Sequence, residues 1–233
     1  MKTYRSSTGQ FSERPFYTDE DVERMCVDAL KLNGLMPTQP EKVRIDRFVE
    51  KHFKIGISYE SLIDDGVLGY TKFGQKGVVS VHIDDPVDRT VSAERRVRST
   101  LAHEAGHGLM HTHLFCSEFN HRGLFGSDPD VSQEKVLCRD GDATSQRSGY
   151  AGRWWELQAN MAIGALLMPR ELLVSAMEPY LEGTGFFQMI SLNEDRREES
   201  VRAASDIFDV NPAVARIRIE KIFKKNSPNQ LTL

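Results

Sequence analysis

Two histidines separated by three residues, in the stretch His103-Glu104-Ala105-Gly106-His107, are the residues whose types and spacing most directly indicate chemistry. On a helix, residues four apart lie one turn apart on the same face, so both imidazoles can point at one metal ion. The glutamate beside the first histidine then lies next to the water that such an ion activates, and it can accept a proton from it. The spacing predicts a catalytic zinc site with His103 and His107 as ligands and Glu104 as the general base.

A downstream segment, Trp154–Met168, offers a third ligand because it is apolar almost throughout and yet contains Glu156. A helix of this composition should be buried, and a buried carboxylate needs a cation, hydrogen bonds or a metal. A metal held by the two histidines would meet that need, and two histidines, one glutamate and a water form an open catalytic zinc site. The alternative is an ion pair from Glu156 to an arginine such as Arg95 or Arg98.

The histidine motif lies in a predicted long helix, from about Ser92 to Thr112, with Ser92 as its N-cap. Residues four apart form an apolar stripe along this helix, namely Val97, Leu101, Ala105 and Leu109. The two histidines of the motif lie roughly opposite that stripe, so they are not ordinary core histidines of its buried face. The alternative is a pair of solvated surface histidines.

Further side chains near the two motifs are candidates for supporting roles. Asn160, one turn after the glutamate, is predicted to orient a ligand. His111 continues the row of histidines and could hydrogen-bond near the site or stabilise an oxyanion; the alternative is an exposed histidine at the helix end. Tyr150 and Arg153 could donate to the transition state, or they are ordinary surface residues. A Cys138 thiolate could occupy the open metal position and keep an enzyme latent.

Cys116 and Cys138, together with His113 or His121, could bind a second metal, although they lack the tight CxxC pair of most such sites. The three cysteines of the chain are widely spaced and odd in number, which excludes a secreted disulfide framework. We find no apolar run that could serve as a signal segment or a membrane span. The sequence therefore predicts a cytoplasmic protein without a membrane partner.

The stretch HEAGH, followed by ELQAN, an apolar run and LLMP, resembles the ImmA/IrrE family of bacterial metallopeptidases. In that family an HExxH motif precedes an ExxAN helix that supplies the glutamate ligand. The resemblance implies corresponding roles for His103, Glu104, His107 and Glu156, with Asn160 as the asparagine of the second motif.

The resemblance is strongest over residues 92–170, and residues 38–85 also look like the helix and small antiparallel sheet that precede the motif in that family. It implies a zincin-like fold and an intracellular, regulatory protease. Known members cleave helix-turn-helix repressors that control mobile elements or stress responses. The chain departs from the family in the unusual length of the segment between the two motifs.

The predicted fold is α+β and zincin-like, with a small three-stranded antiparallel sheet packed on helices and a helical C-terminal region. The predicted strands are 56–62, 67–73 and 77–83. The predicted helices are 20–32, 39–53, 92–112, 154–168, 170–181, 195–208 and 212–224. The predicted parts are a flexible N-terminal arm (1–18), a metallopeptidase domain (19–181) with a long loop insertion (113–153), and a C-terminal region (182–233) that resembles a helix-turn-helix.

The chain of 233 residues has a net charge of -4, which gives no support for a nucleic-acid or membrane binder. The last predicted helix carries basic residues that could contact DNA, namely Arg216, Arg218, Lys221, Lys224 and Lys225. Such a face is more often solvated, so a nucleic-acid partner is not expected. The leading prediction is an intracellular, regulatory zinc endopeptidase that cleaves a protein partner, which the family resemblance implies is a helix-turn-helix transcriptional repressor. The alternative is a non-catalytic regulator on a zincin fold that binds DNA or protein through its C-terminal helices.

Overall fold

The computed structural model describes residues 2–5, 13–62, 66–86, 88–123, 134–139, 154–184 and 189–223. Within these ranges the protein is a mixed α and β structure with a helical C-terminal part, as the sequence predicts. The α-helices are α1 (Asp19–Leu32), α2 (Ile45–Phe53), α3 (Val91–Gly123), α4 (Trp154–Leu167), α5 (Arg170–Met177), α6 (Arg197–Phe208) and α7 (Pro212–Ile222), and a 3-10 helix, η1 (Glu178–Tyr180), follows α5. The strands are β1 (Lys2–Arg5), β2 (Glu13–Phe16), β3 (Ile57–Glu60), β4 (Val67–Gly74), β5 (Gly77–Asp84), β6 (Glu134–Arg139), β7 (Leu181–Thr184) and β8 (Met189–Leu192).

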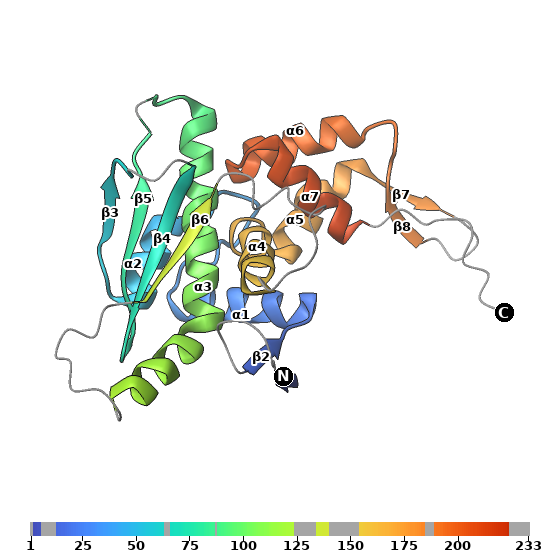
Figure 1. The fold of residues 1–233 in the computed structure, drawn as a ribbon. Helices are drawn as coiled ribbons and strands as arrows, with labels where there is room; N and C mark the ends of the chain where they lie inside the picture. The colour runs from blue at the N-terminus through green and yellow to red at the C-terminus, as the bar shows by residue number, and fades with distance from the viewer. Residues whose placement is uncertain are drawn as a thin grey trace.

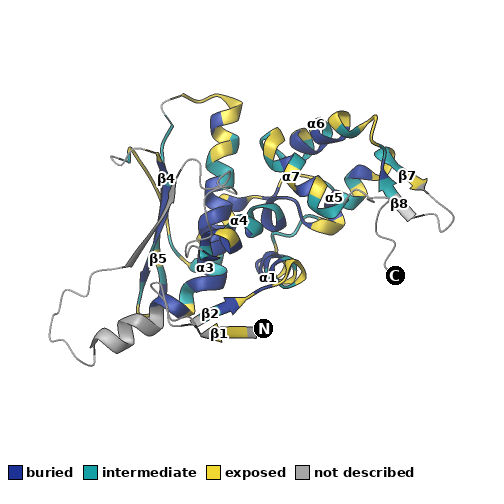
Figure 2. Cartoon of the chain, turned by 45° about the vertical axis from the view of Figure 1, so that its right-hand side comes forward, coloured by how far each residue is buried: buried dark blue, intermediate teal, exposed yellow. Residues whose placement is uncertain are grey.

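Helix α3 is the central element of the fold. The sheet of β3 to β6 lies along one side of it, and α4 packs on another side, with α1 next to α4 (Figure 1). All residues from 100 to 108 are buried, because this part of α3 is covered by the sheet and by α4. Figure 2 shows the same burial where α3 and α4 meet. The histidine motif therefore lies in the protein interior.

The central sheet has the strand order β3-β5-β4-β6. Strands β4 and β5 form an antiparallel hairpin that turns between Gly74 and Gly77, whereas β3 pairs with β5 in parallel. The predicted three-stranded antiparallel sheet has its strands at the right positions but is wrong about this pairing. Turn residues between two strands indicate a reversal of the chain, but they do not specify whether the second strand lies beside the first or one position further away.

The loop insertion predicted over residues 113–153 is wrong in part, because α3 continues to Gly123 and β6 pairs antiparallel with β4. Residues 113–122 contain no glycine or proline that would end the helix. Phe115 is buried, and its ring stacks on that of Phe73 with the centroids 4.3 Å apart. This contact with β4 favours continuation of the helix beyond the predicted end.

The flexible arm predicted over residues 1–18 is wrong for the described residues 2–5 and 13–16, since β1 and β2 pair antiparallel there. The rings of Tyr4 and Phe16 meet edge to face with their centroids 6.2 Å apart. Tyr17 is buried, and its hydroxyl donates to the backbone oxygen of Met110 on α3 at 3.4 Å. The largely polar composition predicted disorder, but Tyr4 and Phe16 meet across the hairpin and Tyr17 attaches its end to α3.

Most predicted helices are confirmed to within a few residues. Helix α2 begins at Ile45, later than predicted, and Pro40 disfavours helical backbone in the residue before it. At the start of α3 the predicted cap Ser92 is replaced by Thr90, whose hydroxyl accepts from the Ala93 N–H at 3.3 Å. None of the helices in the described ranges is both long enough and apolar enough to cross a membrane.

In the C-terminal part, α6 and α7 confirm the two last predicted helices. The helix predicted over 170–181 ends at Met177, because Pro179 cannot donate a helical hydrogen bond and its ring crowds the preceding turn. The strands β7 and β8, which pair antiparallel, were not predicted. Their short segments carry no run of alternating apolar and polar residues long enough to indicate strands.

Close packing between α3 and α4 depends on Gly106. A Cβ atom at this position would lie 2.8 Å from the Cβ of Ala162 and 3.1 Å from the backbone oxygen of Ala159. Carbon atoms in contact prefer separations of about 3.5–4.0 Å, so a larger residue would push the helices apart. The contact with Ala159 is to backbone, and rotation of a side chain cannot relieve it. The absence of a side chain at Gly106 thus sets the distance between the two helices.

We expect Gly106→Ala to destabilise the protein, because the added methyl group overpacks the contact between α3 and α4. Overpacking should lower the free energy of unfolding by about 1–3 kcal/mol. We expect this loss to exceed the ~1 kcal/mol by which alanine favours a helix over glycine. Urea denaturation measures the change. The control is Gly56→Ala, because a Cβ there meets nothing within 4 Å, and its stability should change by less than about 0.5 kcal/mol. A Gly106→Ala variant as stable as the wild type would contradict the close approach.

Candidate metal centre

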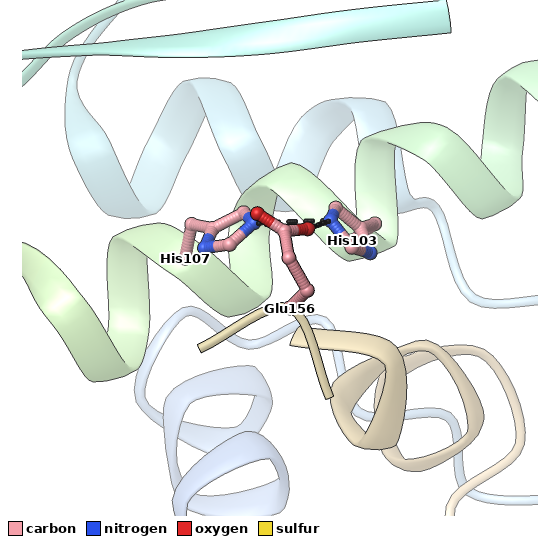
Figure 3. Close-up of side chains that lie close together, drawn as sticks. All are labelled: His103, His107 and Glu156. Carbon is pink, nitrogen blue, oxygen red and sulfur yellow. Dashed lines mark hydrogen bonds and ion pairs between the residues drawn. The ribbon is translucent and has the colours of Figure 1, made fainter. Parts of the chain in front are cut away.

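Side chains from two helices meet at one point in the interior. His103 and His107 of α3 and Glu156 of α4 direct their polar atoms at one another (Figure 3). The His103 and His107 Nε2 atoms lie 3.0 Å apart, and the Glu156 Oε2 atom lies 3.1 Å from the first and 3.4 Å from the second. The structure therefore brings together the three side chains predicted as ligands, and we call them the His-His-Glu group.

The burial of these side chains decides between the alternatives left open by the sequence. His103 and His107 are 2% and 0% exposed, so the alternative of two solvated histidines is wrong. That alternative is wrong because the sheet and α4 cover α3 on more than the face that carries its apolar stripe. The proposed ion pair from Glu156 to an arginine is also wrong. Arg95 Nε donates to Asp209 Oδ1 at 3.1 Å, and Arg98 Nε donates to the Asp209 backbone oxygen at 2.9 Å.

The His-His-Glu group fits a metal ion. Asn160 Oδ1 lies 2.9 Å from His103 Nδ1. An amide oxygen only accepts, so the proton of this ring lies on Nδ1 and the Nε2 lone pair faces the group. Ligands about 2.0–2.1 Å from a tetrahedral ion lie about 3.4 Å apart, close to the 3.0, 3.1 and 3.4 Å measured here. The group could therefore bind a metal ion, and Asn160 lies where it would orient one of the ligands.

The protonation of the group favours a cation. Burial lowers the pKa of His107, so its ring is neutral near pH 7. Burial acts to raise the pKa of Glu156, but the effect of the two adjacent histidines is larger and places the pKa well below its usual range. An ionised carboxylate and neutral imidazoles are the forms that bind metals.

Glu104 lies next to His103 and is fully buried. Its Oε2 atom accepts from the Thr71 hydroxyl of β4 at 2.6 Å, whereas its Oε1 atom has no hydrogen-bond partner among the described residues. Burial raises the pKa of this carboxyl to about 7, although the neighbouring His103 and the hydrogen bond from Thr71 act to lower it. A buried carboxylate oxygen without a donor, beside the His-His-Glu group, is what a general base for a water molecule requires.

His111 is buried, so the alternative of an exposed histidine at the helix end is wrong. Its Nδ1 lies 3.0 Å from His107 Nδ1, and its Nε2 lies 2.9 Å from Gln158 Oε1 on α4. Burial lowers its pKa to about 3, so the ring is neutral. His111 contacts the Nδ1 side of His107, whereas the Nε2 side of that ring faces the His-His-Glu group. An oxyanion role therefore gains no support.

Sequence reasoning missed Thr71 and Gln158, which contact the general-base candidate and His111. A signal existed for Gln158, because a glutamine in an otherwise apolar helix needs a buried partner. Thr71 carries no such signal, since threonine is common in strands.

Several predicted candidates fall outside the part of the chain that can be described. Tyr150 and Arg153 lie outside the described residues. The backbone of Cys138 pairs with Gly69 in the sheet, but its side chain is not described, and the same holds for the side chains of Cys116 and His121 on α3. The latency thiol and the second metal site therefore stay predictions.

The basic residues of α7 that suggested DNA binding make ion pairs within the chain. Arg216 pairs with Glu198 of α6. Arg218 is buried and pairs with Glu23 of α1, which lies far away in the sequence. Lys221 Nζ lies 2.6 Å from Asp19 Oδ1. These pairs give the basic face a role in attaching α7 to the rest of the protein.

Comparison with known proteins does not assign the chain to a family. No protein-family model matches the chain, and no curated protein matches it. Inference about function therefore rests on the residues and geometry of the site.

We expect the protein to bind one divalent metal ion per chain through the His-His-Glu group. His107→Ala removes a ligand, and zinc affinity should fall by more than the roughly 10- to 100-fold that loss of an outer partner costs. Competition titration against a chromophoric chelator measures the affinity. The matched control is His82→Ala, because the His82 ring contacts Glu60 at 2.6 Å and lies outside the group. Equal affinities for the two variants would exclude the group as the metal site.

Removal of the metal should lower the melting temperature. An ion that binds only the folded state stabilises it by about 2.7 kcal/mol when its free concentration is 100 times Kd. Thermal unfolding with zinc and with a chelator measures this difference. The Glu156→Ala variant serves as the control, since it lacks a ligand and its melting temperature should respond much less to zinc. A wild-type protein that melts at one temperature under both conditions would contradict metal binding.

Proposed function

We propose that this protein is an intracellular zinc-dependent endopeptidase of the ImmA/IrrE type, with a zincin-like fold, that cleaves a protein partner such as a helix-turn-helix repressor. The observation that carries the proposal is the combination of the buried His-His-Glu group with Glu104, whose second oxygen has no partner among the described residues. The motifs HEAGH and ELQAN support the family and the substrate class.

The donor set supports zinc and a catalytic role. Two imidazoles and one carboxylate are the protein ligands of many catalytic zinc sites, and three ligands leave a position for water or substrate. Structural zinc sites are usually closed by four cysteine or histidine ligands. A zinc ion in the group would polarise the peptide carbonyl and lower the pKa of the attacking water.

The chain itself supplies the proton transfers of the hydrolysis. Glu104 accepts a proton from the water molecule while the water oxygen forms a bond to the carbonyl carbon of the substrate. The same carboxyl then returns the proton to the leaving nitrogen as the C–N bond breaks, which gives a carboxylic acid and an amine. Thr71 fixes one oxygen of Glu104 by donating its hydroxyl proton at 2.6 Å, so that the other oxygen is the one that acts.

Glu104→Gln is expected to abolish peptide cleavage while zinc affinity stays within a few-fold of the wild type. An amide of the same shape keeps the packing, but it cannot accept the proton of the water. Loss of a general base typically costs 10²–10⁴-fold in rate. Mass spectrometry of a peptide library incubated with the zinc-loaded protein measures the cleavage.

The matched control is Glu60→Gln, because Glu60 is an exposed glutamate that bonds Tyr70 and His82 in the sheet. This variant should cleave like the wild type. Co-expression with a helix-turn-helix repressor encoded nearby, followed by a search for its fragments, tests the substrate class. Cleavage retained by Glu104→Gln would exclude the proposed mechanism.

A further inference from the structure

A series of hydrogen bonds leads from the His-His-Glu group to the N-terminal strand β2. His107 Nδ1 lies 3.0 Å from His111 Nδ1, and His111 Nε2 lies 2.9 Å from Gln158 Oε1. Gln158 Nε2 donates to the backbone oxygen of Pro15 at 2.8 Å. The series crosses from α3 to α4 and ends on a segment more than 140 residues away in the sequence.

The direction of every bond in this series follows from its last member. The Pro15 oxygen only accepts, so the amide nitrogen of Gln158 faces it and the amide oxygen faces His111. That oxygen also only accepts, so His111 carries its proton on Nε2 and has a lone pair on Nδ1. His107 must then donate from Nδ1, which leaves its Nε2 lone pair directed at Glu156 and His103. One backbone carbonyl thus selects the tautomer that a metal ligand needs.

The surroundings keep solvent away from this series. His111 and Gln158 are 0% and 6% exposed. The Trp154 ring meets the His111 ring edge to face with their centroids 5.7 Å apart. The guanidinium of Arg14 lies 5.9 Å from the centroid of a Trp154 ring, which places β2 against the same tryptophan. Competing donors from water are therefore excluded from the rings, and the protein alone sets their tautomers.

We infer that His111 and Gln158 are positioning residues that fix His107 in the metal-binding tautomer, and that the Pro15 carbonyl of the N-terminal segment determines their orientation. The inference rests on the metal centre of the proposed function, but it concerns residues outside the HExxH and ExxAN ligands. It connects the Pro15 carbonyl to the metal centre, although Pro15 lies in the segment that composition alone assigns to a flexible arm.

The first test is NMR of the metal-free wild-type protein, in which long-range 1H–15N correlations report which ring nitrogens carry protons. We expect a proton on His107 Nδ1, and on His111 a proton on Nε2 with none on Nδ1. A bare His107 Nδ1, or a proton on His111 Nδ1, would overturn the inference. This readout does not require metal binding, so it separates failure of the tautomer series from failure of the proposed function, which would show as no zinc binding by the wild type.

The second test compares two substitutions of one residue. His111→Asn places an amide oxygen near the former Nδ1 position, so it can still accept from His107, whereas His111→Leu removes the acceptor. A purely structural role would favour leucine, because the site is buried and leucine is the better helix former. We expect His111→Leu to lower zinc affinity about 10- to 100-fold, the usual cost of losing an outer partner, and His111→Asn to stay within a few-fold of the wild type.

Gln158→Met tests the far end of the series. It keeps the length of the side chain but removes both of its hydrogen bonds, so the His111 tautomer loses its selection by Pro15. We expect zinc affinity to fall about 10-fold, together with a mixture of His111 tautomers in the NMR spectrum. Wild-type affinity and tautomers in Gln158→Met, or higher affinity in His111→Leu than in His111→Asn, would overturn the inference.

Discussion

Three electron-rich atoms that meet in the protein interior are the constraint on which the rest of this structure depends. The Nε2 atoms of His103 and His107 and the Oε2 atom of Glu156 lie within 3.4 Å of one another. Such atoms repel unless a cation or a proton lies between them. The fold holds them there through the tight contact of α3 and α4 at Gly106, and through the sheet on another side of α3.

The sequence predicted most of the helices and the first three strands of the central sheet, because these elements carry local periodicity and clear turn residues. It did not predict which strands pair, and the parallel contact of β3 with β5 depends on the path of the chain rather than on a pattern within either strand. It also failed for the described residues 2–5 and 13–18. Tyr4 and Phe16 meet across the β1–β2 hairpin, and Tyr17 reaches Met110, which is distant in sequence.

The three residues of the His-His-Glu group were predictable because the chemistry of a metal site constrains both residue type and spacing. His103 and His107 lie one helical turn apart, and Glu156 was marked by its apolar surroundings. Their hydrogen-bond partners were harder to predict. Asn160 lies one turn from Glu156 and shares its helix, whereas Thr71 reaches Glu104 from a strand. The contact between Thr71 and Glu104 forms only when the sheet packs on α3, so no local pattern of the sequence encodes it.

The two halves of the site are held by different parts of the molecule. Thr71 of the sheet fixes Glu104, whereas Asn160 and Gln158 of α4 fix the histidines directly or through one further ring. A small slide of the sheet against the helices would therefore shift the Glu104 carboxyl and leave the His-His-Glu group in place. A misplacement of about 1 Å can cost on the order of 100-fold in rate. In the proposed peptidase, a shift of the sheet would therefore change turnover without changing metal occupancy.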